Sequence, residues 1–482
     1  MRPSKEAMVS ETAAHPDEAA SSEEMRKAHE DLSAIDWKFR QWARQDLACL
    51  RRSTFDGPHP LRALVAHDLQ PWPTFVSASK IGQLADAGQA VSRLVRQIPQ
   101  RVFQNAPERM AEFYGLRNAD LVTKLLSSPN GIAEAASRSD FVGSTEGLKC
   151  LEFNSTANLG GWESSIMADI VLRVPVIERF VRQHGLRFSI TDSLRKMLSY
   201  AIRRAQGAGF AEGQRVHLAV LVLEGSHLLQ HPMAPRILGQ VLDAACREVD
   251  PALSGRLLLA RGDELEERPE GLFVHGQRIH TLLAVQLAAG GKLIFKAFKK
   301  KQLHLYNSPA DVFLNDKRNF ALLSEQPGTG PWNPAEEDLI RAHIPWTRCF
   351  QSATSGYRGE TIQLPELAIT QQRRMVLKKA LSLGGHDVVL GKSVDTSTWD
   401  RAVDKALRSG DWILQELVDS RPYLYQNGEE GCTAHDLVWG VFVFGEVFGG
   451  TTLRVLPKAA HGIVNATQGA TKSLVLELST PS

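Results

Sequence analysis

The stretch Cys150-Leu-Glu-Phe-Asn-Ser-Thr-Ala-Asn-Leu-Gly-Gly161 is the starting point for interpreting the chain. Residues 148–153 predict a short apolar strand, whose alternation places Glu152 and Asn154 on one face. A Gly-Gly turn and an amphipathic helix over residues 163–173 follow. A carboxylate and an amide oxygen where a strand ends suit a hard cation such as Mg2+. The alternative is an edge strand with its polar side in water, and this stretch by itself favours that alternative.

The composition is that of an ordinary globular protein. A length of 482 residues predicts two or three lobes, because one small core does not grow to that size. Hydrophobic residues make up 43% and charged residues 23%, both of which are average values. The formal net charge of +2 offers no basic surface of the kind that nucleic-acid binders use, so no nucleic-acid partner is expected.

The cysteines and the apolar runs predict a cytoplasmic protein. Five cysteines are scattered without a CxxC pair, which favours reduced thiols over a disulfide or zinc framework. No apolar run approaches the ~20 residues of a membrane span, so no membrane partner is expected. Residues 1–24 lack an apolar signal core and predict a disordered tail. A homodimer is left open.

The first half of the chain predicts a helical cap followed by a hairpin. Residues 25–130 have helical periodicity interrupted by prolines. The next region, 131–210, opens with a strand at 137–142 that turns at Gly143–Gly147 into the Glu152 strand. Arg138 and Asp140 lie on the first of these strands, where a surface ion pair is an equally good interpretation.

Residues 211–290 predict an α/β lobe. The apolar run 216–223 is typical of a strand buried on both faces. A helix over 234–249 and a strand over 256–260 complete a βαβ unit, and a hairpin follows at 271–277. The region contains no GxGxxG, so no dinucleotide site is assigned to it.

The last region, 291–482, predicts antiparallel strands with basic and amide residues. Lys317 begins a helix, although a solvated helix face is the simpler interpretation of this lysine. Residues 374–391 predict strand, turn and strand, with Lys378 ending the first strand and Gly384–Gly385 in the turn. Glycine backbone can approach phosphates closely, although no GK[ST] or following helix makes this a Walker loop. With the strands at 412–418, 436–444 and 451–455, this region is a candidate nucleotide clamp.

The order of these blocks over residues 130–475 resembles the circularly permuted ATP-grasp ligases, the branch that includes eukaryotic-type glutathione synthetase and glutathionylspermidine synthase. The resemblance implies a circularly permuted ATP-grasp fold of the α+β or α/β class. The N-terminal helical region and an inserted βαβ lobe at 211–290 would be added to it. Residues 291–482 would be the nucleotide-binding lobes.

The resemblance also implies a role for each site residue. Glu152 and Asn154 would hold Mg2+. ATP would be bound by lysines at its phosphates, by a glycine flap, by a hinge at the adenine and by an acid at the ribose, which are Lys317, Lys378, Gly384, Gly385, Gln415, Glu416, Leu417, Val418 and Asp436. Arg454 would face the reacting carboxylate. The substrates would be contacted by Arg138, Asp140, Asn158, Arg454 and Asn465, with Arg138 and Arg454 in the catalytic role.

The sequence departs from the family pattern in the flap. The family lysine is usually followed by proline, and here Lys379 stands in that place. An acidic metal ligand often lies four residues after the lysine, and here Ser382 has that spacing. Asp387 is the nearest acid, beyond the glycines.

The activity that the resemblance implies is ligation of a carboxylate to an amine, with ATP and Mg2+ as cofactors. The partners would be a small-molecule or peptide carboxylate and an amine acceptor, joined through an acyl phosphate. The contrasting hypothesis is a non-catalytic ATP-binding regulatory or scaffold protein, which Ser382 favours.

Overall fold

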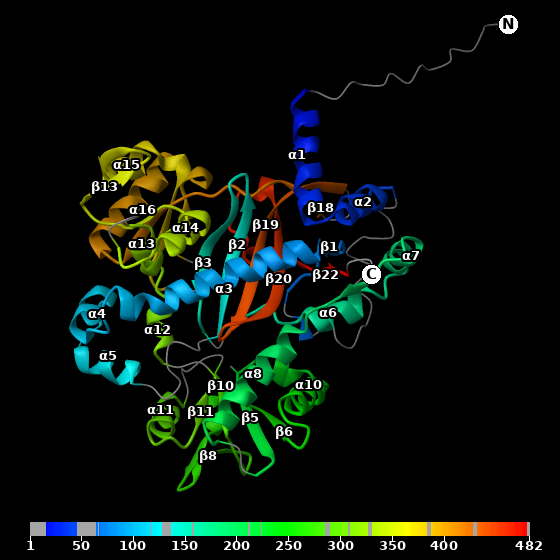
Figure 1. Cartoon of the computed structure of the whole chain (residues 1–482), viewed down its shortest axis with the longest axis vertical. Coiled ribbons are helices and arrows are strands. Elements are labelled where there is room, and N and C mark those ends of the chain that lie inside the picture. The colour runs from blue at the N-terminus through cyan, green and yellow to red at the C-terminus, as the bar shows by residue number, and fades with distance from the viewer. Residues whose placement is uncertain are drawn as a thin grey trace, which may run out of the picture.

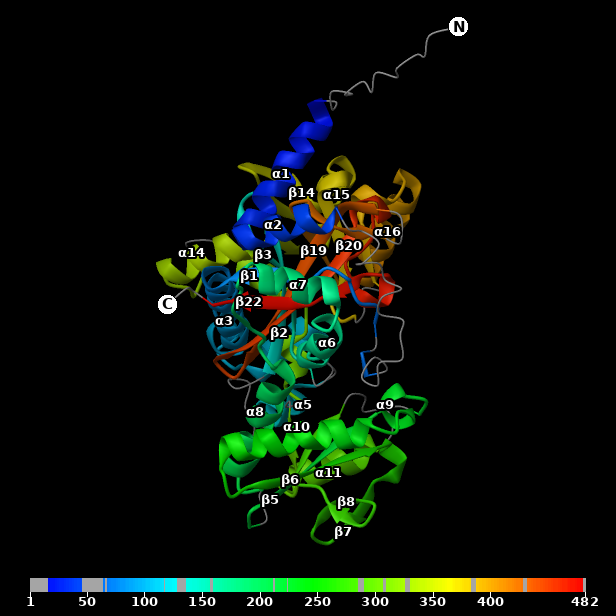
Figure 2. The same cartoon turned by 90° about the vertical axis from the view of Figure 1, so that its right-hand side faces the viewer.

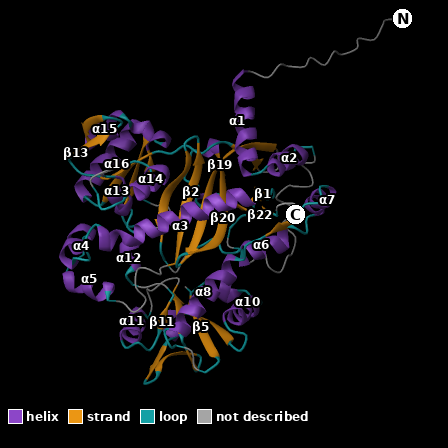
Figure 3. Ribbon diagram, viewed as in Figure 1, coloured by secondary structure: helices purple, strands orange, loops and turns teal. Residues whose placement is uncertain are grey.

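The computed structural model of the chain describes residues 16–45, 64–65, 67–116, 118–127, 136–156, 159–210, 213–222, 224–284, 290–306, 309–325, 330–382, 387–427 and 431–479. It is a mixed α/β protein in which a large central sheet is flanked by two smaller lobes (Figures 1 and 3). No helix in these ranges combines the length and the apolar character needed to cross a membrane.

The central sheet is antiparallel and carries the predicted hairpin. Its order is β21-β20-β19-β2-β3, and β18 also pairs with β19. The strands are β2 (Ala136–Ser144), β3 (Gly147–Asn154), β18 (Tyr423–Asn427), β19 (Gly431–Phe444), β20 (Val447–Pro457) and β21 (Thr471–Ser473). Asp140 lies opposite Glu152, and Arg138 opposite Asn154. Because directly opposite residues share a face, these polar side chains lie together.

Helix α3 (Ala78–Arg101) covers the other face of this sheet (Figure 3). Gly88 lets the helix approach β19 closely, because a Cβ there would lie 2.5 Å from Val441 Cγ1. Ser139 is paired with Val441 and therefore also faces the helix. Since side chains alternate along a strand, Arg138 and Asp140 point away from α3.

The N-terminal region differs from the prediction in two respects. Helix α1 (Pro16–Leu32) begins within the predicted disordered tail, so residues 16–24 are helical. Helix α2 (Ala34–Ala43) follows, but the predicted helical cap also contains a strand, β1 (Thr74–Ser77). This strand pairs in parallel with β22 (Val475–Leu478) near the end of the chain (Figure 2). Strand β4 (Phe188–Ser189) completes this small sheet.

The lobe formed by residues 213–306 confirms the βαβ prediction. Its four strands are parallel in the order β11-β10-β5-β6, and α10 connects β5 to β6. The predicted hairpin adds strands β7, β8 and β9. The bounds are β5 (Arg215–Leu221), α9 (His227–Gln230), α10 (Ala234–Val249), β6 (Ser254–Ala260), β7 (Glu266–Arg268), β8 (Gly271–Val274), β9 (Gln277–Arg278), β10 (Thr281–Ala284), α11 (Gly291–Lys299) and β11 (His304–Leu305).

The other lobe, residues 347–416, has its own apolar core around Trp399 and Trp412. Its antiparallel sheet has the order β12-β17-β15-β16, with a separate hairpin of β13 and β14. The bounds are β12 (Thr347–Cys349), β13 (Thr354–Tyr357), β14 (Glu360–Gln363), α15 (Leu364–Thr370), β15 (Met375–Lys379), β16 (Val388–Leu390), α16 (Thr396–Ser409) and β17 (Trp412–Glu416). We call this part the upper lobe, from its place in Figure 1.

The remaining helices connect these parts. They are α4 (Pro107–Tyr114), α5 (Ala119–Leu126), α6 (Ser164–Val171), α7 (Pro175–Gln183), α8 (Ser193–Gly207), α12 (Asp311–Leu314), α13 (Arg318–Ser324) and α14 (Pro334–His343).

Candidate functional site

A cleft lies between the polar face of the central sheet and the sheet of the upper lobe. One side is built by β2, β3, β19 and β20, and the other by β15, β16 and β17. The residues that join β17 to β18, 417–422, are called the linker below, and Leu417, Val418 and Ser420 of the linker line the cleft. The predicted site residues that line it are Asp140, Glu152, Lys378, Gln415, Glu416, Leu417, Val418, Asp436, Arg454 and Asn465.

Apolar side chains form much of the wall of this cleft. They come from both sheets and are Val142, Leu151, Val376, Val388, Leu390 and Val438. An apolar slot with a few polar groups at its ends is the usual form of a small-molecule site.

Lys378 is a buried cation in the lining of the cleft. Its Nζ donates to Gln415 Oε1 at 2.6 Å and to the Leu151 carbonyl at 2.8 Å. Burial lowers the pKa of Lys378 to about 8. The nearby carboxylate of Glu152 acts to raise this pKa, and the positive charge of Lys317 acts to lower it further. An anionic ligand here would stabilise the charged form of the lysine.

Lys317 approaches the same place from the N-terminal end of α13. Its Nζ lies 3.1 Å from Glu152 Oε1 and donates to the Ser382 carbonyl at 2.9 Å. Lys317 is not itself among the residues that line the cleft, but Glu152 is. The two lysines are thus brought together through Glu152, from segments that are far apart in sequence.

Asp140 lies between two arginines. Arg138 donates to it from Nε at 2.8 Å and from Nη2 at 3.1 Å. Arg454 Nη2 lies 2.8 Å from Asp140 Oδ2 as an ion pair without hydrogen-bond geometry, and Arg454 Nε has no hydrogen-bond partner among the described residues. Burial by itself would raise the pKa of Asp140, but the two guanidinium groups hold it below its usual value.

Gly440 makes room for this arrangement. Gly440 is on β19, where it lies opposite Asp140 of β2 on one side and Thr452 of β20 on the other. A Cβ at this position would be 2.6 Å from Thr452 Cγ2 and 2.8 Å from Arg138 Cδ. The side chain of Arg138 can therefore cross β19 only because the residue there is glycine.

The predicted metal ligands are a carboxylate that lines the cleft, Glu152, and an amide beside it, Asn154. Asn154 has a buried Nδ2 without a hydrogen-bond partner in the described ranges, and rotation of the amide would present its oxygen instead. The described residues contain no group of three or more His, Cys, Asp or Glu side chains that could hold a metal. Two protein ligands with substrate phosphates suit Mg2+, which rarely has an all-protein cage.

Three predicted residues lie in the cleft but have other partners. Glu416 Oε1 accepts hydrogen bonds from Arg358 at 2.6 Å and from Tyr357 at 3.0 Å, so its carboxylate is engaged within the upper lobe. Asp436 pairs with Lys458 at 2.7 Å. Asn465 Oδ1 accepts from the backbone of Thr467. A ligand would have to compete with these partners.

The other predicted positions are not in the cleft or not described. Arg138 and Asn154 are neighbours of the lining residues rather than part of the lining. Arg138 also donates to the Gly160 carbonyl at 2.7 Å, which ties the Gly-Gly turn to the site. Asn158, Gly384 and Gly385 lie outside the described residues.

Sequence reasoning missed two charged pairs near the site. Lys392 lines the cleft and pairs with Asp419 of the linker at 2.6 Å. Lys472 lies opposite Arg454 on β21 and forms a buried ion pair with Glu163 at 2.7 Å. Glu163 lies two residues after Gly161, but nothing in the sequence indicated a partner so far along the chain.

Comparison with known proteins shows a likeness of fold. No family model matches the chain, and no curated protein matches its sequence significantly. A solved structure that is similar is that of a glutathione synthetase-like effector from Globodera pallida in its apo form. The likeness has a TM-score of 0.51 and 15% identity, and it covers 84% of this chain and 89% of that one. This is consistent with an ATP-grasp-like fold.

Proposed function

We propose that the protein is an ATP- and Mg2+-dependent ligase that joins a carboxylate to an amine. The convergence of Lys378, Glu152 and Arg454 with the linker on a single cleft carries the proposal. This set contains a cation for phosphates, an oxygen ligand for a metal and a guanidinium for a carboxylate. The fold that the chain shares with a glutathione synthetase-like protein supports the same activity. A circularly permuted connectivity of the ATP-grasp fold is part of the proposal.

In the first step the substrate carboxylate attacks the γ-phosphorus of ATP, and ADP leaves. Bound Mg2+, held by Glu152 and Asn154, would neutralise charge on the phosphates. Lys378 and Lys317 stabilise the phosphoryl oxygens, and the linker holds the base against the apolar wall. Arg454 orients the carboxylate, since a guanidinium binds a carboxylate through two parallel hydrogen bonds.

In the second step the amine nitrogen attacks the carbonyl carbon of the acyl phosphate. The carbon–oxygen bond to phosphate breaks, inorganic phosphate leaves, and the nitrogen loses a proton to water. Arg454 and Arg138 would stabilise the oxyanion that forms in between. The chain thus acts through position and charge, and the mechanism needs no nucleophilic side chain.

Ser382 favours a second candidate, a non-catalytic ATP-binding regulator. Its backbone carbonyl, rather than a carboxylate, faces Lys317 at 2.9 Å. A site with one acidic metal ligand fewer would still bind nucleotide through the linker and lysines, but it would stabilise phosphoryl transfer less well.

A screen of paired carboxylates and amines separates the two candidates. ADP release that requires both members of a pair, with a product whose mass equals their sum minus water, supports the ligase. MgATP binding without ADP release for any pair supports the regulator. The absence of both would overturn both proposals.

A further inference from the structure

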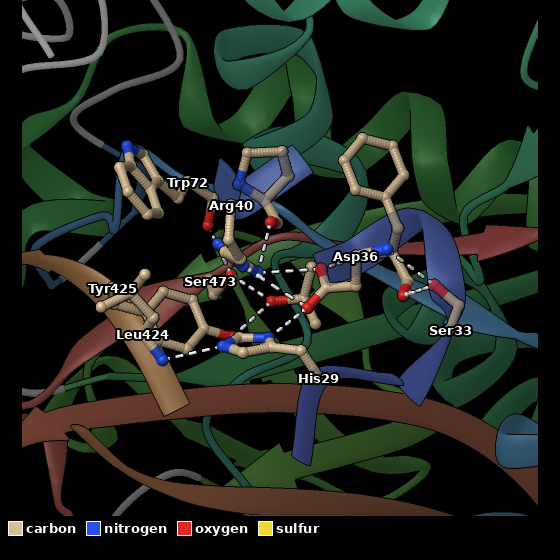
Figure 4. Close-up of polar contacts among 11 residues, drawn as sticks. His29, Ser33, Asp36, Arg40, Trp72, Leu424, Tyr425 and Ser473 are labelled. Atoms are coloured by element: carbon tan, nitrogen blue, oxygen red, sulfur yellow. Dashed lines mark hydrogen bonds and ion pairs between the residues drawn. The ribbon is translucent and has the colours of Figure 1, made fainter. Parts of the chain in front are cut away.

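The buried side chain of His29 on α1 forms hydrogen bonds with both α2 and β18 (Figures 1 and 4). The backbone N–H of Leu424 donates to His29 Nε2 at 2.7 Å. Nε2 is therefore the unprotonated nitrogen, and Nδ1 donates to Asp36 Oδ2 at 2.5 Å. Burial lowers the pKa of His29, which keeps the ring neutral.

Asp36 and Arg40 of α2 extend this contact to the β1 region (Figure 4). Asp36 Oδ1 accepts from the backbone N–H of Phe75 at 2.8 Å. Arg40 donates to Asp36 and to the Pro73 carbonyl, both at 2.9 Å, and its guanidinium lies 4.3 Å from the ring centre of Tyr425 on β18. The side chains of His29, Asp36 and Arg40 are fully buried, so substrate cannot reach this cluster.

A second contact reaches the linker itself. Asp31 near the end of α1 binds Lys80 of α3 at 2.6 Å and lies 3.8 Å from Arg421. The backbone N–H of Arg421 in turn donates to the Gly143 carbonyl on β2 at 2.9 Å. The C-terminal end of the linker is thus held between α1 and the central sheet.

The other end of the linker is held by the upper lobe. The N–H of Glu416 donates to the Trp346 carbonyl and that of Leu417 to the Arg374 carbonyl, both at 2.8 Å. Between these two anchors lie Val418 and Ser420, which line the cleft. The path of the linker past the cleft is therefore set at one end by β17 and at the other by α1, β18 and the central sheet. At this second end, Ser420 accepts hydrogen bonds from the backbone N–H of Leu437 and from Lys458.

We propose that His29, Asp31, Asp36 and Arg40 are positioning residues for the nucleotide-binding linker. The inference rests on the proposed function, because the linker is there assigned to the base of ATP. Loss of the His29 contact leaves the buried N–H of Leu424 without its side-chain acceptor and removes one of the hydrogen bonds to the buried carboxylate of Asp36. The start of β18 and the linker should then become mobile together, and the base would lose a fixed surface.

Hydrogen exchange tests this inference without nucleotide. We expect His29→Phe to speed amide exchange in residues 417–427 at least tenfold and Asp31→Ala to speed it severalfold. Asp31 is partly exposed, so its variant keeps the proposal testable where His29→Phe fails to fold. Val403→Ala, which opens the separate core of the upper lobe, is the matched control and should leave residues 421–427, at the end of the linker next to α1 and β18, unchanged. Unchanged exchange of these residues in Asp31→Ala would overturn the inference.

A kinetic measurement distinguishes positioning from a general loss of stability. In the full-length Asp31→Ala protein, KM for ATP should rise about three- to tenfold while kcat changes less than twofold. An equal fall of kcat, or a change in KM for the amine instead of ATP, would contradict the inference. If the wild-type protein does not bind MgATP, the proposed function fails, whereas the exchange experiment still decides whether α1 and α2 hold the linker.

Discussion

At the scale of single residues, the site consists of carboxylates that each lie next to more than one positively charged side chain. Asp140 compensates Arg138 and Arg454, and Glu152 compensates Lys317 and lies near Lys378. Removal of one member of a buried ion pair usually costs more than the pair contributes, because the remaining charge is left without a partner. Conservative substitutions that keep the charge are therefore the informative ones.

The pKa of Lys378 predicts how nucleotide affinity depends on pH. Because burial lowers this pKa to about 8, the lysine is charged below pH 8 and loses its proton above it. Phosphate stabilises the charged form, so binding of MgATP should take up a proton and weaken roughly tenfold per pH unit above 8. Titration calorimetry between pH 7 and 9.5 measures this. Lys378→Arg should give a flat profile, and a pH-independent Kd in the wild type would rule out a direct role for Lys378.

Arg454→Lys tests the residue that would face the carboxylate. The substitution keeps a cation beside Asp140, so MgATP affinity and folding should stay nearly unchanged. Ligation should fall roughly a hundredfold or more, since one lost oxyanion contact is worth about 3 kcal/mol. Measurement of kcat for ligation and of Kd for MgATP, each in the variant and in the wild type, separates the two effects. Normal ligation by Arg454→Lys would remove Arg454 from the mechanism.

At the scale of elements, strand β19 makes room for the side chain of Arg138 because it has glycine at position 440. Gly440→Ala should displace Arg138 or Thr452 and lower the free energy of unfolding by about 1–3 kcal/mol, as overpacking does elsewhere. Gly431→Ala on the same strand is the control, because nothing lies within 4 Å of its added Cβ. Denaturant unfolding compares the two. Equal stability of both variants would show that Arg138 does not depend on this space.

The elements were predictable where the pattern is local. The β2–β3 hairpin, the β5–α10–β6 unit and the antiparallel pairing of β15 with β16 follow from alternation, apolar runs and glycines that are close in sequence. Strand β1 was missed because it is four residues long and its partner, β22, lies at the far end of the chain. The ion pairs of Glu163 with Lys472 and of Lys392 with Asp419 were also missed, because an ion pair between segments that are separated in sequence leaves no periodic pattern. The family resemblance, rather than the residues themselves, suggested the roles of Lys317 and Arg454.

At the scale of the whole molecule, the cleft lies between parts of the chain that have separate apolar cores. The central sheet belongs to the main core, whereas the upper lobe has a core of its own. A ligand that bridges both would stabilise the folded state by mass action. We expect the melting temperature to rise with the concentration of MgATP, and to rise less in Lys378→Met. A melting temperature that does not respond to millimolar MgATP would count against both candidate functions.

The transfer of an oxygen atom from the carboxylate to phosphate would be direct evidence that the protein forms an acyl phosphate. An acyl-phosphate ligase moves one oxygen of its carboxylate substrate into the phosphate that it releases. Incubation with ATP, an amine and a panel of 18O-labelled carboxylates, followed by mass spectrometry of the phosphate, detects this step. Our account predicts one 18O atom per phosphate and an amide product in equal amount. Phosphate that contains no 18O although ADP is released, or no ADP release with any pair, would contradict it.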